Sequence, residues 1–493
     1  MAPHHDAIIV GAGFGGLGAA IQFRRLGLRN LAILERGDGV GGVWRANRYP
    51  GVAVDIPSAN YSFSFEPNPY WSRLYAPGTE ILRYAEHVTD KYGLRGSLSC
   101  GTTVDSARWM PAAEHWSVRL QDGRELTARF LVTATGSLSQ PKRPDIPGLD
   151  DFAGPVLHTA YWDDGHDLDG RRVAVIGTGA SAVQAVPEIA RRARTVTVFQ
   201  RTPVWVLPRV DVPIPRAAAR LFALLPATHQ AARLANAAAM EFITVVGGQH
   251  YRRAPWANKA VELLGRAHLR AQVPDAETRS ALTPGYTFGC KRPTASNAYL
   301  AAFAQPRVRL VTEAIEQVER DGVRVADGTL VEADVLVLAT GFDVWDQNFP
   351  AFRVEGRDGR DLGQWWRTTR FQAYQGLSIP GFPNFLSMTS PYSYTGLCYF
   401  WTVESQMRHM ARLFGELRRR GAETFEVREE ADAEFGERMR EAAHGSIYGQ
   451  AGCAAVNGYY FSPHGDPAIA RPSSAWRGLR ENASFPLGDY AFC

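Results

Sequence analysis

Short apolar runs alternate with amphipathic stretches along this chain, and one arrangement of them occurs twice. Residues 7–10 read Ala-Ile-Ile-Val, which is typical of a buried strand, and a helical pattern of apolar residues follows over 17–26. Residues 172–176 read Arg-Val-Ala-Val-Ile and precede a second strand-like run at 195–199. Strands that alternate with helices in this way form parallel sheets covered by helices. The pattern predicts an α/β protein with two such units.

A glycine-rich turn follows the first of these strands. Residues 11–16 read Gly-Ala-Gly-Phe-Gly-Gly, and the next strand-like run, 31–34, ends at Glu35. In a G-x-G-x-x-G turn the glycines permit a tight turn, close approach to a pyrophosphate and close packing of helix on strand. An acid at the position of Glu35 binds a ribose hydroxyl. We therefore expect a dinucleotide site here rather than a purely structural turn.

The second unit carries a related turn with a different ending. Residues 177–182 read Gly-Thr-Gly-Ala-Ser-Ala, where alanine replaces the third glycine, as the motif permits. After the strand at 195–199 the chain continues with Gln200-Arg201-Thr202 and has no acid there. An arginine at this point accommodates the 2′-phosphate of NADP. The first unit is therefore expected to bind FAD and the second NADPH, with a solvated surface side chain as the alternative for Arg201.

Composition narrows the class of protein and its location. The 493 residues are 45% hydrophobic, and 54 basic residues against 50 acidic ones leave a net charge of +4 spread along the chain. Such a chain is globular and gives no reason to expect a nucleic-acid partner. Lysine is rare among the basic residues, which favours a GC-rich bacterial genome. No signal-peptide pattern is present, and the longest apolar run, near 234–248, contains Glu241, so we expect a cytoplasmic protein without a membrane span.

The cysteines argue against one class of flavoprotein. They lie at positions 100, 290, 398, 453 and 493, far apart and odd in number. We therefore expect neither a disulfide framework nor a metal site. Flavin-dependent disulfide reductases also contain two dinucleotide folds, but they need a close cysteine pair to pass electrons onward, and the sequence suggests none.

Two longer motifs lie beside these units. Residues 41–55 read G-G-V-W-R-A-N-R-Y-P-G-V-A-V-D, and residues 152–163 read F-A-G-P-V-L-H-T-A-Y-W-D. They resemble the fingerprints G-G-x-W-x4-Y-P-G-x3-D and F-x-G-x-x-x-H-x-x-x-W-D of the type I Baeyer–Villiger monooxygenases. The runs that end in Ala-Thr-Gly at Gly136 and Gly341 also resemble the strands by which such folds leave the flavin domain and return to it.

This resemblance covers residues 7 to about 420 and implies an activity. In such enzymes FAD is reduced by NADPH and reacts with O2 to a C4a-peroxyflavin. That species inserts one oxygen next to the carbonyl of a ketone, here expected to be bulky and apolar, to give an ester or lactone. The protein's part is to position the reactants and to stabilise negative charge away from water.

The resemblance also implies roles for individual residues. Arg292 is expected to lie over the flavin and stabilise negative charge, Asp55 to hold the Arg292 guanidinium, and Lys291 to contact the NADP phosphate. His158 and Trp162, from the motif between the two units, are also expected to take part in catalysis, and we expect His158 to couple the domains rather than to act as an acid or base. The residues expected to bind the cofactors are Gly11, Gly13, Phe14, Gly16, Glu35, Gly42, Val43, Trp44, Asp55, Tyr61, Val104, Gly177, Thr178, Gly179, Ala180, Ser181, Ala182, Arg201, Thr202, Lys291, Arg292 and Tyr399.

The predicted layout consists of two Rossmann-like domains, the NADP domain inserted into the FAD domain. Residues 1–147 form the first part of the FAD domain, and residues 336–493 form its second part and a C-terminal tail. Residues 148–335 form the NADP domain. Within that domain a stretch rich in Ala, Leu and Arg, with apolar residues at helical spacing, predicts a helical insertion over about 213–281.

Two alternatives stay open from the sequence alone. A flavin-containing monooxygenase, which oxygenates nitrogen or sulfur, shares F-x-G-x-x-x-H but does not require Trp162 and Asp163. A non-catalytic, nucleotide-gated flavoprotein would keep both dinucleotide sites without turnover. Neither the ketone nor the oligomeric state can be read from the sequence.

Overall fold

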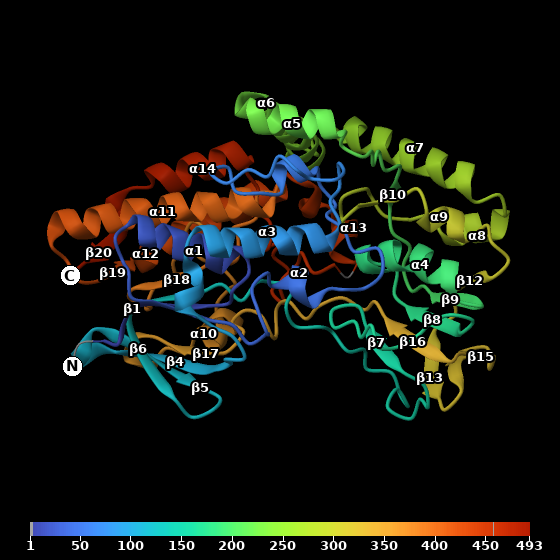
Figure 1. Ribbon diagram of the computed structural model, residues 1–493, viewed down its shortest axis with the longest axis horizontal. Helices are drawn as coiled ribbons and strands as arrows, with labels where there is room; N and C mark the ends of the chain where they lie inside the picture. The colour runs from blue at the N-terminus through green and yellow to red at the C-terminus, as the bar shows by residue number, and fades with distance from the viewer. Residues whose placement is uncertain (1–2, 457) are drawn as a thin grey trace.

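The computed structural model describes residues 3–456 and 458–493 and contains two main sheets side by side (Figure 1). The first sheet has the order β17-β4-β5-β6-β1-β2-β3, with β18 also paired to β6. Strands β6, β1 and β2 run parallel. The strands of this sheet are β1 (His5–Val10), β2 (Leu31–Leu34), β3 (Leu98–Ser99), β4 (Val104–Met110), β5 (His115–Leu120), β6 (Glu125–Thr133), β17 (Arg353–Glu355) and β18 (Phe385–Ser387).

The first turn forms where the glycine pattern predicts it. The chain turns at Gly11 after β1, enters α1 (Phe14–Arg25) and returns as β2 parallel to β1. Gly11 has a φ of +106°, and a Cβ there would lie 2.5 Å from the backbone oxygen of Ala134. Glycine alone fits both this conformation and this close approach.

The second sheet is parallel throughout and has the order β12-β9-β8-β16-β7. The chain leaves the first sheet after β6 and returns to it at β17 and β18, so the second unit is inserted into the first. The predicted α/β fold with two Rossmann-like units is therefore confirmed. The strands of this sheet are β7 (Val156–His158), β8 (Arg172–Ile176), β9 (Thr195–Phe199), β12 (Val308–Val311) and β16 (Val335–Leu338).

Three small sheets accompany the main ones. One is an antiparallel meander next to the second sheet, and the two others are strand pairs. Their strands are β13 (Ile315–Glu319), β14 (Gly322–Val325), β15 (Leu330–Glu332), β10 (Val206–Leu207), β11 (Thr294–Ala295), β19 (Phe425–Val427) and β20 (Tyr490–Phe492).

The insertion is helical, as its sequence predicts, and lies along one edge of the molecule above both main sheets (Figure 1). It consists of α5 (Arg216–Leu224), α6 (Pro226–Phe242), the π-helical turn η4 (Ile243–Gln249), α7 (Pro255–Gln272) and α8 (Ala276–Ala281). The other helices are α2 (Val43–Ala46), α3 (Gly78–Lys91), α4 (Ala180–Arg192), α9 (Tyr299–Ala302), α10 (Leu362–Thr368), α11 (Tyr399–Arg420), α12 (Glu429–His444), α13 (Ala451–Ala454) and α14 (Ala475–Ser484).

A buried arginine attaches α6 to the first half of the molecule. Arg233 is 1% exposed, and its Nη1 donates to the backbone oxygen of Ser62 at 2.7 Å and to that of Ala59 at 3.3 Å. The Glu404 carboxylate lies 3.9 Å from its Nη2. Because Tyr61 lies between the two carbonyls in sequence, this contact also positions a residue expected to bind a cofactor.

The expectation that the chain forms no disulfide is wrong. Cys290 and Cys453 are bonded, with their Cα atoms 4.8 Å apart although 163 residues separate them in sequence. The spacing of the cysteines along the chain does not indicate this pair, because Cys290 lies in the loop after the insertion and Cys453 lies in α13. Only the folded C-terminal part brings the two segments together.

Two features are absent from the described residues. Over residues 3–456 and 458–493, no helix is both long enough and apolar enough to cross a membrane. In the same part of the chain, no group of three or more His, Cys, Asp or Glu side chains is arranged to hold a metal ion.

Replacing Arg233 by methionine is expected to weaken the attachment of α6. The substitution leaves two buried backbone oxygens and Glu404 without their cation, so the free energy of unfolding should fall by roughly 2–4 kcal/mol. Chemical denaturation followed by circular dichroism measures the loss. Arg220→Met, at an exposed position of α5, is the control and should change stability by less than about 0.5 kcal/mol. Equal losses in both variants would contradict the role assigned to Arg233.

Candidate active site

One cavity of about 2430 Å³ extends between the two halves of the molecule. Both glycine-rich turns, the loop 41–55 and the loop that carries Lys291 and Arg292 line it. A pocket for one drug-sized ligand usually measures about 300–1000 Å³. The cavity therefore has room for two dinucleotides with a small molecule between them.

The first turn offers the cavity an open backbone and a fixed acid. Gly13 precedes α1 and faces Gly42, so that a Cβ on Gly13 would lie 3.6 Å from the Gly42 Cα. The Glu35 carboxylate accepts hydrogen bonds from the backbone N–H groups of Ala12 and Gly37, both at 2.8 Å. A fixed carboxylate beside a helix N-terminus fits the ribose and pyrophosphate of a dinucleotide.

Aromatic side chains form a wall next to this turn. The Trp44 indole N–H donates to the Tyr61 hydroxyl at 2.9 Å, and the two rings meet edge to face. Phe14 packs on Phe400 with ring centroids 4.6 Å apart. Burial raises the pKa of Tyr61 well above its ordinary value, so the phenol stays protonated and the wall stays uncharged. The predicted cofactor residues Val43, Val104 and Tyr399 line the cavity as well.

The second turn repeats the geometry of the first. Gly177 has a φ of +114°, and a Cβ there would lie 2.4 Å from the Ala339 oxygen. The Thr178 hydroxyl donates to the Thr202 oxygen at 2.9 Å, which ties the turn to the end of β9. A Cβ on Gly179 would meet nothing within 4 Å, so this glycine leaves open space at the start of α4. Ala180 and Ser181 continue the lining.

Two of the residues predicted to bind cofactors lie outside the lining of the cavity. Gly16 packs against Gly11 so closely that a Cβ would lie 1.9 Å from the Gly11 oxygen, and Ala182 is fully buried. Both hold the third position of their glycine motifs, which serves close packing of helix on strand. They shape the turns, and any part in binding is indirect.

Arg201 and Lys291 bring two positive charges to the end of the cavity near the second turn. Arg201 follows β9, Lys291 comes from the loop after the insertion, and both line the cavity. Burial lowers the pKa of Lys291, and the charge of Arg201 lowers it further. Two neighbouring cations repel each other, and a dianionic phosphate between them would relieve the repulsion. The pair fits the 2′-phosphate of NADP.

Arg292 and Asp55 form an ion pair at the cavity wall. The Nε and Nη2 atoms of Arg292 lie 2.8 Å and 2.6 Å from Asp55 Oδ2. The Arg292 side chain keeps 44% of its surface accessible because it faces the cavity. Asp55 raises the pKa of the guanidinium well above its ordinary value, and the nearby phenols of Tyr459 and Tyr460 act in the same direction. The structure thus places a permanent, oriented cation at the cavity wall, beside the end of the loop 41–55.

His158 lies behind the cavity, where the two connections between the halves meet. Its Nδ1 accepts from the Ala160 N–H at 3.0 Å, so Nε2 carries the proton and faces the Thr340 hydroxyl at 3.3 Å. The Thr340 hydroxyl in turn donates to the Lys142 oxygen at 2.5 Å, and the Lys142 N–H donates to the Gly341 oxygen at 2.9 Å. Burial lowers the pKa of His158, which keeps the ring neutral at pH 7. The ring therefore links the outgoing and the returning strand.

The Trp162 side chain is buried among apolar residues. It is 5% exposed, belongs to the apolar core of the second half and shows one edge to the cavity. The neighbouring Asp163 accepts from the Gly165 N–H at 2.8 Å at an exposed turn. The catalytic part expected of Trp162 stays a prediction.

Sequence reasoning missed a contact that sets the spacing of the two halves. The Tyr49 hydroxyl donates to Gln184 Oε1 at 2.9 Å, and Gln184 Nε2 donates to the Ala53 oxygen at 3.1 Å. Gln184 lies in α4 of the second unit, whereas Tyr49 and Ala53 lie in the loop 41–55, which ends at Asp55. A glutamine within a helix gives no sequence signal for such a role.

Comparisons with known proteins agree with this geometry. Residues 8–245 match the profile of the pyridine nucleotide-disulphide oxidoreductase family. The chain is 39% identical to a Baeyer-Villiger monooxygenase of Streptomyces coelicolor over 491 residues, 99% of this chain and 92% of that one.

Solved structures agree as well. An oxidized steroid monooxygenase bound to NADP superimposes with a TM-score of 0.87 at 32% identity, covering 100% of this chain and 99% of that one. OTEMO in complex with FAD and NADP gives 0.88 at 25% identity, with both chains covered to 100%. The chain therefore belongs to the Baeyer–Villiger monooxygenases, and it is an NADPH-dependent flavoprotein oxidoreductase.

Proposed function

We propose that this enzyme acts on a bulky, apolar ketone and that Arg292 is the residue that stabilises negative charge while oxygen is transferred. FAD, when bound, takes reducing equivalents from NADPH and activates O2. The observation that carries the proposal is the ion pair between Arg292 and Asp55 at the cavity wall. The two residues come from different halves, so the cation is complete only when both halves are in place.

The chemistry of the guanidinium supports this role. It cannot lose its proton in a protein, so it stabilises an anion without protonating it. Asp55 holds Nε and Nη2, and within the described chain Nη1 makes no hydrogen bond. One edge of the planar group is thereby fixed, and the other is left for the reacting oxygen atoms.

The lining of the cavity supports an apolar substrate. Side chains from the insertion and from the C-terminal part contribute hydrocarbon surface to the lining. A ketone with a large hydrocarbon body suits such a wall. The apolar lining residues include Met240, Ile243, Val246, Trp256, Leu397 and Phe461.

We further propose a division of the cofactors between the halves. FAD occupies the end formed by residues 1–147 and 336–493, beside Glu35, and NADPH occupies the end formed by 148–335, beside Arg201. Direct contact with FAD is assigned to the open first turn and the aromatic wall. A cytoplasmic location belongs to the same proposal.

Product analysis tests the function. The purified protein is incubated with NADPH and a panel of ketones and thioethers, and mass spectrometry detects the gain of one oxygen. Esters or lactones from apolar ketones are expected. Sulfoxides without esters would favour oxygenation of nitrogen or sulfur. A flavin that dithionite bleaches and NADPH does not would indicate a non-catalytic protein.

Arg201→Ala is expected to weaken NADPH binding far more than NADH binding. A charge-assisted contact to the 2′-phosphate contributes roughly 1.5–3 kcal/mol, so the preference for NADPH should shrink about tenfold or more. Dissociation constants from fluorescence titration measure it. The control is Arg194→Ala, which replaces an exposed arginine directly before β9, and it should change neither constant. Equal losses for both cofactors in Arg201→Ala would show that another group reads the phosphate.

Arg292→Ala is expected to uncouple the reaction. The variant should still be reduced by NADPH and still consume O2, but it should release hydrogen peroxide in place of ester. Asp55→Ala, which removes only the group that orients the cation, should show a milder form, and Arg292→Lys should recover part of the coupling. Stopped-flow absorbance and peroxide assays separate these steps. Normal coupling in Arg292→Ala would assign the charge stabilisation elsewhere.

His158→Ala is expected to slow turnover and reduction by NADPH about tenfold, because the ring's contact with Thr340 on the returning strand and its local bond to the Ala160 N–H are both lost. FAD content, read from the absorbance of the purified variant, should stay that of the wild type. His158→Asn, whose amide can replace the acceptor at Nδ1, should be less affected. Since the wild-type ring is neutral above its lowered pKa, its contribution should not change between pH 7 and 9. Selective loss of oxygen insertion with normal reduction would contradict a coupling role.

A further inference from the structure

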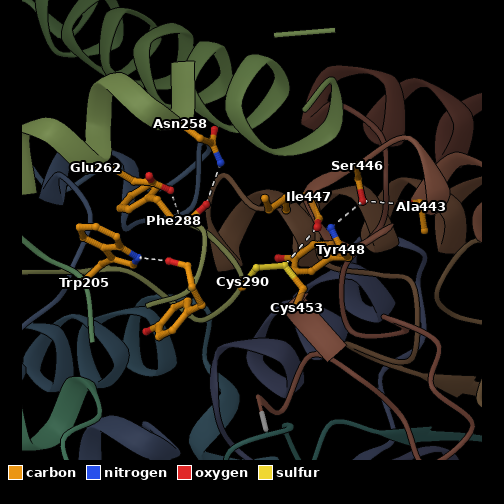
Figure 2. The surroundings of a disulfide bond; sticks show 11 residues. Trp205, Asn258, Glu262, Phe288, Cys290, Ala443, Ser446, Ile447, Tyr448 and Cys453 are labelled. Carbon is orange, nitrogen blue, oxygen red and sulfur yellow. Dashed lines mark hydrogen bonds between the residues drawn. A yellow bond between two sulfur atoms is a disulfide. The ribbon is translucent and has the colours of Figure 1, made fainter. Parts of the chain in front are cut away.

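Figure 2 shows the disulfide between Cys290 and Cys453. It joins two segments that line the cavity, since Gly289, Lys291 and Ile447 belong to the lining. Cys290 directly precedes Lys291 and Arg292 in the chain. Both cysteines are buried, at 1% and 0% exposed, in a small apolar cluster around Ile447. The bond therefore ends two residues from the cation on which the proposed chemistry depends.

Hydrogen bonds hold the loop before Cys290 on the side of the insertion. The Trp205 indole N–H donates to the Tyr286 oxygen at 2.9 Å, and Asn258 Nδ2 donates to the Phe288 oxygen at 2.7 Å. The Phe288 N–H donates to Glu262 at 2.9 Å (Figure 2). These contacts end at Phe288, before the segment that carries the two cations.

The other end of the bond lies in a segment that follows α12. The Ser446 hydroxyl donates to the Ala443 oxygen at 2.6 Å and accepts from the Tyr448 N–H at 3.2 Å (Figure 2). The Cys453 N–H donates to the Gln450 oxygen at 3.0 Å. These bonds are local, and the Trp345 indole N–H, which donates to the Tyr459 oxygen at 3.0 Å, attaches the segment to the first half of the molecule.

The disulfide is what joins these two segments. Within the described residues, no hydrogen bond or ion pair connects residues 284–293 with residues 443–461. Their remaining contact is packing, such as the approach of Gly289 to Ile447, where a Cβ would lie 3.6 Å from Cγ1. Tyr459 and Tyr460, which lie near Arg292, belong to the same C-terminal segment. Opening the bond would leave the Arg292 loop and the segment that carries Tyr459 and Tyr460 connected by packing alone.

We propose that Cys290 and Cys453 form a reversible redox modification site that locks the Arg292 loop against the C-terminal segment. The bonded form couples oxygen uptake to product formation, and the dithiol form lets the loop move and releases more hydrogen peroxide. The effect on coupling rests on the proposed role of Arg292, whereas the cysteine chemistry does not. In reducing compartments, disulfides of this kind are usually transient and redox-sensing.

Hydrogen peroxide is the oxidant. One thiolate attacks a peroxide oxygen, the O–O bond breaks, and a sulfenic acid and hydroxide form; the hydroxide takes up the proton that the thiol had lost and becomes water. The second thiolate attacks that sulfur, the S–S bond forms, and the hydroxide that leaves takes up a proton as a second water. Two thiols and one peroxide thus give one disulfide and two waters, and a dithiol reductant reverses the change. Both steps need the thiolate form of the attacking cysteine. Peroxide from uncoupled turnover would close the bond and so limit its own formation.

Differential alkylation and limited proteolysis test the site without turnover. Wild-type protein is reduced with dithiothreitol, freed of reductant, and then treated or not treated with hydrogen peroxide. Mass spectrometry should find Cys290 and Cys453 alkylated before treatment and linked after it. Proteolysis of the protein stripped of FAD should cut near residues 284–293 or 451–461 several-fold faster in the reduced form.

Turnover then tests the consequence. Reduced wild type and Cys453→Ser should release several-fold more peroxide per NADPH than oxidised wild type, and dithiothreitol should leave Cys453→Ser unchanged. Cys100→Ser, at an exposed free cysteine, is the matched control and should respond to dithiothreitol like wild type. Should Cys453→Ser fail to fold, the two redox forms of wild type decide alone. Thiols that peroxide does not link, or equal proteolysis and equal coupling in both forms, would overturn the proposal.

Discussion

The ion pair between Arg292 and Asp55 requires the two halves of the molecule to meet at one spacing. Its cation comes from the inserted unit and its anion from the long loop of the first, so neither unit presents an oriented charge by itself. A guanidinium held along one edge can stabilise an anion at its other edge without giving up a proton. Much of the surrounding structure serves to keep this pair in place.

Several contacts between the halves help to fix the spacing that this ion pair needs. Gln184 ties α4 to the loop that ends at Asp55, and His158 joins the outgoing and returning strands through Thr340. Each is a short, directional interaction between segments that belong to different units. Directional contacts limit rotation of one unit on the other far better than apolar packing does, because apolar packing tolerates sliding. The disulfide at Cys290 extends the same principle to the loop of the cation itself.

The cavity lining contains both charged and apolar side chains. Its ends carry the glycine turns, the Glu35 carboxylate and the pair of cations at Arg201 and Lys291, which suit charged and hydroxylated ligands. The insertion and the C-terminal segment supply apolar side chains to the lining. Apolar surroundings lower the local dielectric constant and thereby strengthen the interaction of a cation with a developing anion. Arg233 contributes indirectly, since it attaches α6 to the segment that carries Tyr61.

The sequence by itself determined the features whose physics is local. Both glycine turns, the parallel units and the insertion could be predicted because a backbone that needs φ near +110° or a Cβ-free approach restricts the residue type at that position, as at Gly11 and Gly177. The pairing of Arg292 with Asp55 could be anticipated only through a family resemblance. Tertiary structure alone decided which distant residues meet. Examples are the Cys290–Cys453 bond, the Gln184 bridge, the buried Arg233 and the contact of His158 with Thr340. Those contacts depend on how whole units pack. Packing restricts the shape and burial of side chains and not their spacing along the chain, so no short-range sequence pattern predicts these contacts.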